Sequence, residues 1–137
     1  MKTAFGDTFF WLATLHPGDH WHQEVLDRSS QLGPMHIVTT DEVLVAVLAG
    51  LSGLGERMRS AGVALVRELH EDPDVTVVPQ TRTSSMAGLE LYSRRLDKSY
   101  SLSDCISMQM MWARGISEVL TNDRHFSQEG FVDLFRD

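Results

Sequence analysis

The sequence predicts an α/β fold, in which a three-layer α/β/α sandwich is built around a mainly parallel sheet of four to five short strands. Short apolar segments of strand length alternate with longer segments whose apolar residues recur at helical spacing, and glycine or proline separates many of them. Strands that alternate with helices pair in parallel through right-handed crossovers. The 137 residues match about one domain, so we expect a single domain over residues 1–137.

The first part of the chain carries two of the expected strands. Pro17-Gly18 and Gly33-Pro34 end helical segments there. Thr39 and Glu42 have the spacing of a capping box, which marks the start of the following helix. The expected elements are a strand over residues 2–6, helices over 8–15 and 19–32, a strand over 35–38 and a helix over 41–51.

The second part repeats the alternation. Asp72-Pro73-Asp74 is a turn, and Gly115 ends a helix. Met86, Leu89 and Tyr92 recur on one side of a helical segment, so we expect them to face the core. The expected elements are a helix over residues 56–70, a strand over 75–78, helices over 83–96 and 103–113, a strand over 116–120, and a segment over 131–135 that would supply a fifth strand.

Composition narrows the function classes. The net charge is −7, from 19 acidic and 12 basic residues, whereas a binder of nucleic acid usually has a basic surface. An excess of acid fits plain solubility, a basic partner, or carboxylates gathered around a metal ion. Cys105 is the only cysteine, so no internal disulfide can form. No apolar run has the length of a membrane span, and Asp7 puts an acid where a signal peptide would need its apolar stretch. We therefore expect a cytoplasmic protein with no membrane partner.

Three aspartates fall where a parallel sheet places its ligands. Asp7 follows the first strand, Asp104 lies in the first turn of a helix, and Asp123 follows the fourth strand. Each position also has a purely structural explanation. Asp7 could cap the next helix, Asp104 could be a favourable charge at a helix start, and Asp123 could be an ordinary turn residue. If the three converge, their oxygens form a site that hard divalent cations prefer.

Four stretches of the chain resemble the PIN-domain ribonuclease family, and specifically the VapC-type toxins of bacterial toxin–antitoxin systems. The order and spacing of these stretches cover nearly the whole sequence, and the last two are fairly specific. They read FGDTFFWLA at 5–13, VTTDEVL at 38–44, DKSYSLSDCIS at 97–107 and LTNDRHF at 120–126.

The resemblance implies a metal-dependent endoribonuclease that uses Mg²⁺ or Mn²⁺, acts on RNA, forms a homodimer and is blocked by a cognate antitoxin protein. Asp7, Asp104 and Asp123 match the catalytic, metal-binding acids of the family. Asp97 matches an acid that often stands upstream of the third one. The hydroxyls of three further residues would orient water or ligands, namely Thr8, Thr40 and Ser103.

The chain departs from the family pattern at Ala46, where the family usually has a glutamate that joins the site. A methyl group cannot bind a cation. Glu42 lies one helical turn earlier on the same face and could reach the site, although a capping role with Thr39 is the favoured interpretation. We therefore expect weak or absent cleavage, whether the alanine is natural or an inactivating change.

Two other hypotheses stay open. The first is a non-catalytic PIN-like module that binds RNA or a partner protein, and Ala46 is the residue that favours it. The second is a signalling domain similar to response regulators, which also gather acids at strand ends. That class needs a lysine after a late strand, and no lysine follows Leu120.

Overall fold

The computed structural model describes residues 1–136 and contains one sheet of five parallel strands in the order β3-β2-β1-β4-β5. The strands are β1 (Lys2–Gly6), β2 (Met35–Thr40), β3 (Val75–Val78), β4 (Glu118–Leu120) and β5 (Val132–Asp133). The helices are α1 (Thr8–Leu15), α2 (His22–Leu32), α3 (Asp41–Leu51), α4 (Glu56–Glu71), α5 (Arg82–Ser93), α6 (Leu102–Arg114) and α7 (Arg124–Gln128). The predicted α/β class and the parallel sheet are confirmed.

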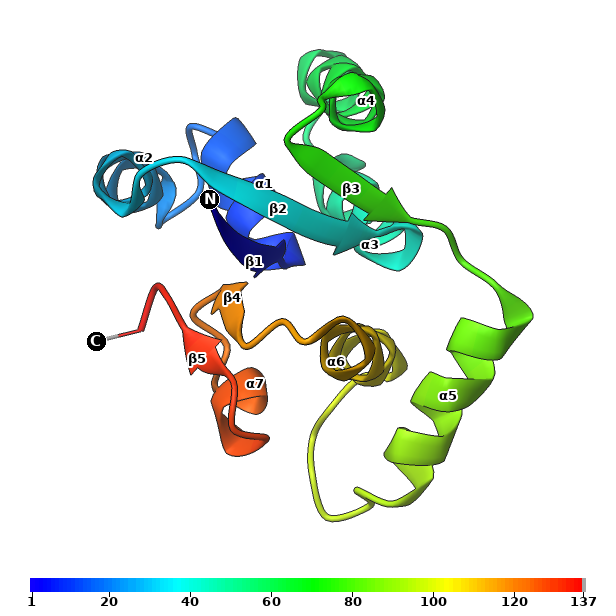
Figure 1. Ribbon diagram of the computed structural model, residues 1–137. Helices are drawn as coiled ribbons and strands as arrows, with labels where there is room; N and C mark the ends of the chain where they lie inside the picture. Colours follow the sequence, from blue (N-terminus) through cyan, green and yellow to red (C-terminus); the bar gives the residue numbers. More distant parts are fainter. Residues whose placement is uncertain (137) are drawn as a thin grey trace.

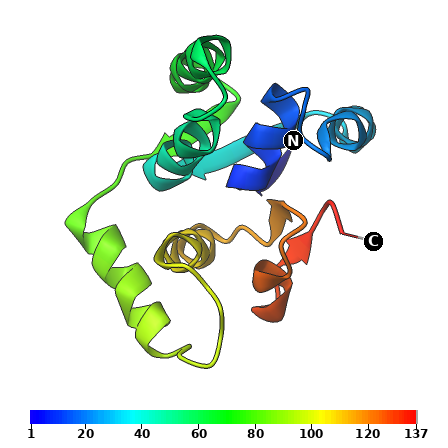
Figure 2. The ribbon, with the colours of Figure 1, turned by 180° about the vertical axis from the view of Figure 1, so that it is seen from behind.

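The helices cover the sheet in two layers. Helices α1 and α2 connect β1 to β2, and helices α3 and α4 connect β2 to β3. Helices α5 and α6 connect β3 to β4, and helix α7 connects β4 to β5. Helices α1 to α4 lie on one side of the sheet, and α5 to α7 lie on the other (Figures 1 and 2). Since all five strands run parallel, their carboxyl ends lie along one edge of the sheet. No helix within residues 1–136 is both long and apolar enough to cross a membrane.

The central strand β1 is exposed at Lys2 and Thr3, is buried from Ala4 onward and ends in a tightly packed turn. Ala4 and Phe5 are completely buried, as expected for a parallel strand covered on both faces. At Gly6, an added Cβ would lie 2.8 Å from Trp11 Cζ2 and 2.9 Å from Ile37 Cγ2, so this position has no room for a side chain. The Gly6 carbonyl accepts hydrogen bonds from Trp11 Nε1 and Thr39 Oγ1, at 3.2 Å and 2.8 Å. This packing fixes the point at which the chain leaves the sheet.

Helix α5 packs on α6 through a face that differs from the predicted one. Met86, Leu89 and Tyr92 are 51%, 46% and 44% exposed, so the prediction that they face the core is wrong. The buried residues of α5 are Gly88 and Leu91. An added Cβ at Gly88 would lie 3.0 Å from the backbone nitrogen of Ile106, so the absence of a side chain lets the two helices approach closely. In both ribbon views α5 lies at the edge of the molecule beside α6 (Figures 1 and 2).

The start of α3 also differs from its prediction in one respect. The helix begins at Asp41 as expected, but its cap is Thr40, whose hydroxyl accepts a hydrogen bond of 3.1 Å from the backbone N–H of Val43. Thr39 instead donates its hydroxyl to the Gly6 carbonyl. The predicted capping pair of Thr39 and Glu42 is therefore wrong. Helix α7 was not predicted, because five residues are too few for a periodic apolar pattern.

Candidate metal and active site

Asp7 is the buried acid of the site. It follows β1 at the start of α1, yet its side chain makes no capping hydrogen bond to that helix. Its Oδ2 accepts a hydrogen bond of 2.9 Å from the Thr121 hydroxyl at the end of β4. Burial raises the pKa of Asp7 to about 6; hydrogen bonds from Thr8 and Thr121 lower that pKa, and the charges of Asp104 and Asp123 raise it further. The Asp7 carboxylate therefore lies near two other negative charges, those of Asp104 and Asp123.

Asp104 is held by the first turn of α6. The Ser101 hydroxyl accepts from the Asp104 N–H at 3.0 Å, and Asp104 Oδ2 accepts from the Ser101 N–H at 3.1 Å, which completes a capping box. The same Oδ2 lies 3.1 Å from His125 Nδ1. No residue of the described chain hydrogen-bonds to Asp104 Oδ1. One oxygen thus fixes the side chain, and the other is available to a ligand.

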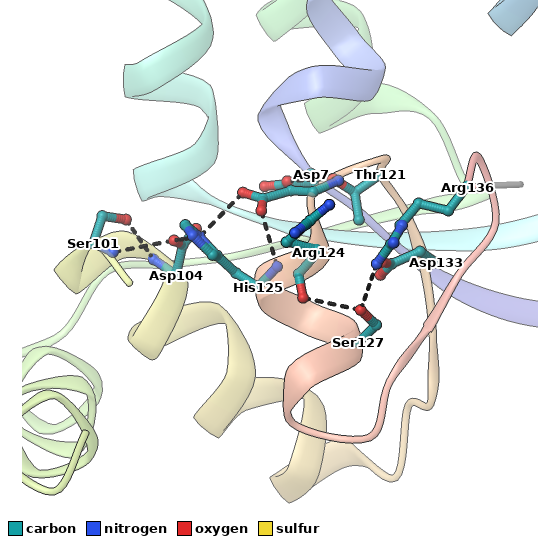
Figure 3. A network of polar contacts seen from close by, with 10 residues as sticks. Asp7, Ser101, Asp104, Thr121, Arg124, His125, Ser127, Asp133 and Arg136 are labelled. Atoms are coloured by element: carbon teal, nitrogen blue, oxygen red, sulfur yellow. Dashed lines mark hydrogen bonds and ion pairs between the residues drawn. The ribbon is translucent and has the colours of Figure 1, made fainter. Parts of the chain in front are cut away.

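Asp123 and His125 come from the loop that leads into α7. Asp123 is the N-cap of this short helix, and its Oδ1 accepts from the His125 N–H at 2.9 Å. Its Oδ2 lies 3.3 Å from His125 Nδ1. Possible ligand atoms of Asp104, Asp123 and His125 all lie within 4.8 Å of one another. Figure 3 shows Asp7, Asp104 and His125 in this one network of polar contacts.

A cavity of about 390 Å³ opens between these side chains at the carboxyl edge of the sheet. Its lining combines carboxylates, hydroxyls and one amide, which are the oxygen ligands that Mg²⁺ and Mn²⁺ prefer. The structure thus brings the acids predicted from the sequence into contact with one cavity, and their chemistry fits a divalent cation. The lining residues are Asp7, Thr8, Phe9, Ala46, Ser101, Ser103, Asp104, Asn122 and Asp123.

Three of the residues predicted to support the site do not line this cavity. Thr40 is buried, and its hydroxyl is used as the cap of α3, so its predicted role in orienting water is replaced by a structural one. The Asp97 side chain is 75% exposed and lies 3.6 Å from Lys98 Nζ. Glu42 lies one turn before Ala46 on α3, and its Oε2 is buried without a hydrogen-bond partner in the described residues.

Sequence reasoning missed His125, Ser101 and Asn122. The side chain of His125 is 25% exposed, and its ring lies between two acids. Because α7 was not predicted, nothing in the pattern showed that the chain turns back toward Asp104 after residue 123. The capping spacing of Ser101 and Asp104 was the available signal for the second residue.

The whole arrangement is similar to a solved structure. The crystal structure of Mycobacterium tuberculosis VapC20, described as a toxin that cleaves the sarcin–ricin loop, matches with a TM-score of 0.82. The identity is 27%, and the match covers 95% of this chain and 97% of that chain. The chain is therefore similar to a VapC-type PIN-domain toxin over nearly its whole length, as the resemblance of its sequence motifs predicted. No protein-family model matches the sequence, and no curated protein matches it.

In this domain, the structure shows where Ala46 lies relative to the acids. The side chain of Ala46 lines the same cavity as Asp7, Asp104 and Asp123, although it comes from α3 on the other side of the sheet from α6. A methyl group therefore stands where a longer acidic side chain would point toward the other carboxylates. The cavity has an acidic side, formed by the strand ends and α6, and an apolar side at α3.

Proposed function

We propose that this VapC-type chain is a metal-dependent endoribonuclease toxin, which cuts RNA phosphodiester bonds at a site for Mg²⁺ or Mn²⁺. The observation that carries the proposal is that Asp7, Asp104 and Asp123 line one cavity in a domain similar to VapC20. A cation bound there would supply charge stabilisation to the phosphate and lower the pKa of an attacking water. Because the chain has a net charge of −7, a bound cation would supply the positive charge that attracts an RNA phosphate.

The protein residues would divide the work by position. Asp7, Asp104 and Asp123 would hold the cation through carboxylate oxygens. The hydroxyls of Thr8 and Ser103, which line the cavity, would orient water or phosphate oxygens. Asp97 and Glu42 lie outside the lining, and we propose no direct contact with the cation for either.

Ala46 favours a second candidate function, a non-catalytic PIN-like module that binds RNA or protein. Removing one of four acids lowers the charge that holds a cation, and ligand charge tunes affinity. We propose that the chain cuts RNA weakly for this reason. The alternative predicts that RNA binds without being cut at all, even when the missing acid is supplied.

The deciding experiment compares four purified proteins: the unmodified chain, Ala46→Glu, Asp104→Asn and the double variant. Each is incubated with total RNA and with a sarcin–ricin loop RNA, in Mg²⁺, in Mn²⁺ and in chelator. We expect slow metal-dependent cleavage by the unmodified chain, faster cleavage by Ala46→Glu, and none by the two variants that carry Asp104→Asn. An inert Ala46→Glu protein that still binds RNA would establish the non-catalytic module instead.

Two partners follow from the proposal. A cognate antitoxin would cover the cavity, and both proteins and the RNA would meet in the cytoplasm. We also propose a homodimer through α5, because Met86, Leu89 and Tyr92 form an exposed apolar stripe on a helix whose other face packs against α6. Stripes of this kind on a small domain are typical of protein interfaces.

A further inference from the structure

A second cluster of polar side chains lies behind the candidate metal site and outside its cavity. Its centre is Glu129, which follows α7 and whose side chain is only 8% exposed. Arg95 donates to this carboxylate twice, from Nε to Oε2 at 3.0 Å and from Nη2 to Oε1 at 3.1 Å. The Tyr100 hydroxyl donates to Oε2 at 2.7 Å. Both carboxylate oxygens are therefore occupied by donors from the segment that connects α5 to α6.

The charges of this cluster are matched to the ionised form of Glu129. The Arg95 hydrogen bonds lower the pKa of Glu129, burial opposes them, and the Tyr100 hydrogen bond lowers that pKa further. Burial and the bond to Glu129 raise the pKa of Tyr100, so the phenol keeps its proton and stays a donor. A mostly buried ion pair contributes little net stability compared with apolar packing. Its contribution is better understood as fixing one arrangement of the chain.

The arrangement that it fixes contains two of the site acids. Tyr100 is buried, and its ring meets the His125 imidazole edge-on at a centroid distance of 5.3 Å. That imidazole contacts both Asp104 and Asp123 through Nδ1. Tyr100 also directly precedes Ser101, the cap that orients Asp104. The cluster therefore touches the site at its histidine and at the start of α6.

We propose that Arg95, Tyr100 and Glu129 form a positioning triad, which locks the segment before α6 to the end of α7 and so sets the separation of Asp104 and Asp123. The inference rests on the proposed function, since the separation matters because a cation must bind both acids. The three residues touch neither RNA nor metal in this role. They act through His125 and through the Ser101 cap.

Variants can separate positioning from simple stability. Tyr100→Phe removes one hydroxyl and keeps the ring beside His125, and Arg95→Gln removes the guanidinium. Arg94→Gln is the matched control, because Arg94 is the neighbouring residue and makes an exposed ion pair with Glu90 at 3.7 Å. We expect both triad variants to weaken Mn²⁺ binding about 10-fold, the loss typical of a residue that supports a metal ligand. Arg94→Gln should leave Mn²⁺ affinity unchanged.

A second readout needs no metal and no RNA. The imidazole NMR signals of His125 in the metal-free protein should shift in Tyr100→Phe and Arg95→Gln and stay in place in Arg94→Gln.

The double variant Arg95→Gln/Glu129→Gln should lose no more Mn²⁺ affinity than either single variant, because parts of one unit are not additive. Arg95→Lys, which keeps the charge, should recover part of the affinity.

The outcomes distinguish the two proposals. If neither the unmodified chain nor Ala46→Glu binds Mn²⁺, the metal-dependent function is wrong, and the His125 signals alone decide the triad. If Mn²⁺ binds but the triad variants match the Arg94→Gln control in affinity and in His125 signals, the triad is wrong. If Arg95→Gln is unfolded, Tyr100→Phe and Arg95→Lys carry the same comparison with smaller changes.

Discussion

The Thr121 hydroxyl donates a hydrogen bond of 2.9 Å to Asp7 Oδ2, and so ties the ends of β4 and β1 together. The Thr121 hydroxyl oxygen in turn accepts a hydrogen bond of 3.1 Å from the backbone N–H of Asp123. A single buried hydroxyl thus contacts one acid of the site through its side chain and another through its backbone. The side chain of residue 121 is as much a part of the site's geometry as the acids themselves.

Thr121→Val should therefore damage both the fold and the site. The substitution keeps the shape of the side chain but leaves Asp7 and the Asp123 N–H without their shared partner. We expect a loss of about 1–3 kcal/mol in the free energy of unfolding, because Asp7 is buried and the Asp123 N–H is partly buried. Mn²⁺ affinity should fall as well. Thr14→Val is the control, since Thr14 donates only to the Phe10 carbonyl and should lower stability without changing Mn²⁺ affinity.

The raised pKa of Asp7 predicts how the stability of the metal-free protein depends on pH. The pKa is about 6 in the folded state and 3.8 in the reference state, so the folded protein binds the extra proton between these values. Stability is then full below the lower value and declines as pH rises through the higher one, by up to about 3 kcal/mol. Asp7→Asn should remove this decline and raise the melting temperature at alkaline pH, with little effect at acid pH. A pH profile of Asp7→Asn that matches that of the unmodified chain would contradict the assignment.

The parts of the fold that depend on local pattern were predictable from the sequence. The strand ends that carry Asp7 and Asp123 follow from short apolar segments, and the helix carrying Asp104 follows from its apolar spacing and from Gly115, which ends it. Parallel pairing then places the ends of β1 and β4 side by side. What this reasoning could not supply is the contact between His125 and Asp104, which depends on a helix of five residues.

The packing of α5 was mispredicted for a different physical reason. The apolar stripe of Met86, Leu89 and Tyr92 shows that one face of the helix is apolar. It does not show whether another part of the same chain covers that face. Gly88 carries no side chain and so adds nothing to the periodic pattern, although it forms the actual contact with α6. Close helix packing through glycine leaves almost no trace in hydrophobic periodicity.

That contact makes Gly88→Ala a sharp test of the α5–α6 packing. Alanine favours helices, but its Cβ would overlap Ile106 Cγ1 and would lie 3.0 Å from the backbone nitrogen of the same residue. We expect a loss of about 1–3 kcal/mol in the free energy of unfolding, as for other overpacked sites. Gly53→Ala is the control, because an added Cβ there meets nothing within 4 Å. Equal melting temperatures for the two variants would show that the helices are free to move apart.

The exposed stripe of α5 leads to a prediction about association. Leu89→Glu places a charge in the middle of the stripe and should convert the proposed dimer into a monomer, with little change in the stability of the single domain. Light scattering at micromolar concentration measures the mass. Val45→Glu is the matched control, because Val45 is 65% exposed on α3 and lies outside the stripe. A monomeric unmodified chain would contradict the proposed dimer, and a monomeric Val45→Glu protein would place the interface at α3.

Ala46 allows the metal site to be tested through stability as well as through cleavage. A glutamate at this position would add a fourth carboxylate to a cavity that already holds Asp7, Asp104 and Asp123. Without metal, the added negative charge should lower the melting temperature of Ala46→Glu below that of the unmodified chain, because like charges repel at short range in a partly buried site. With metal, the order should reverse. A ligand present at about 100 times its dissociation constant stabilises the folded state by about 2.7 kcal/mol, so the variant with the higher affinity gains more at each concentration of Mn²⁺.

Ala46→Gln, which has the same length but no charge, should show neither the loss without metal nor the additional gain with it. Melting curves of the three proteins across a Mn²⁺ titration decide the matter, and a Ca²⁺ titration shows how far the effect depends on the kind of cation. If Ala46→Glu and Ala46→Gln respond alike to Mn²⁺, the side chain of residue 46 does not reach the cation, and the cavity would bind its metal through the acids of β1, α6 and the β4–α7 loop alone.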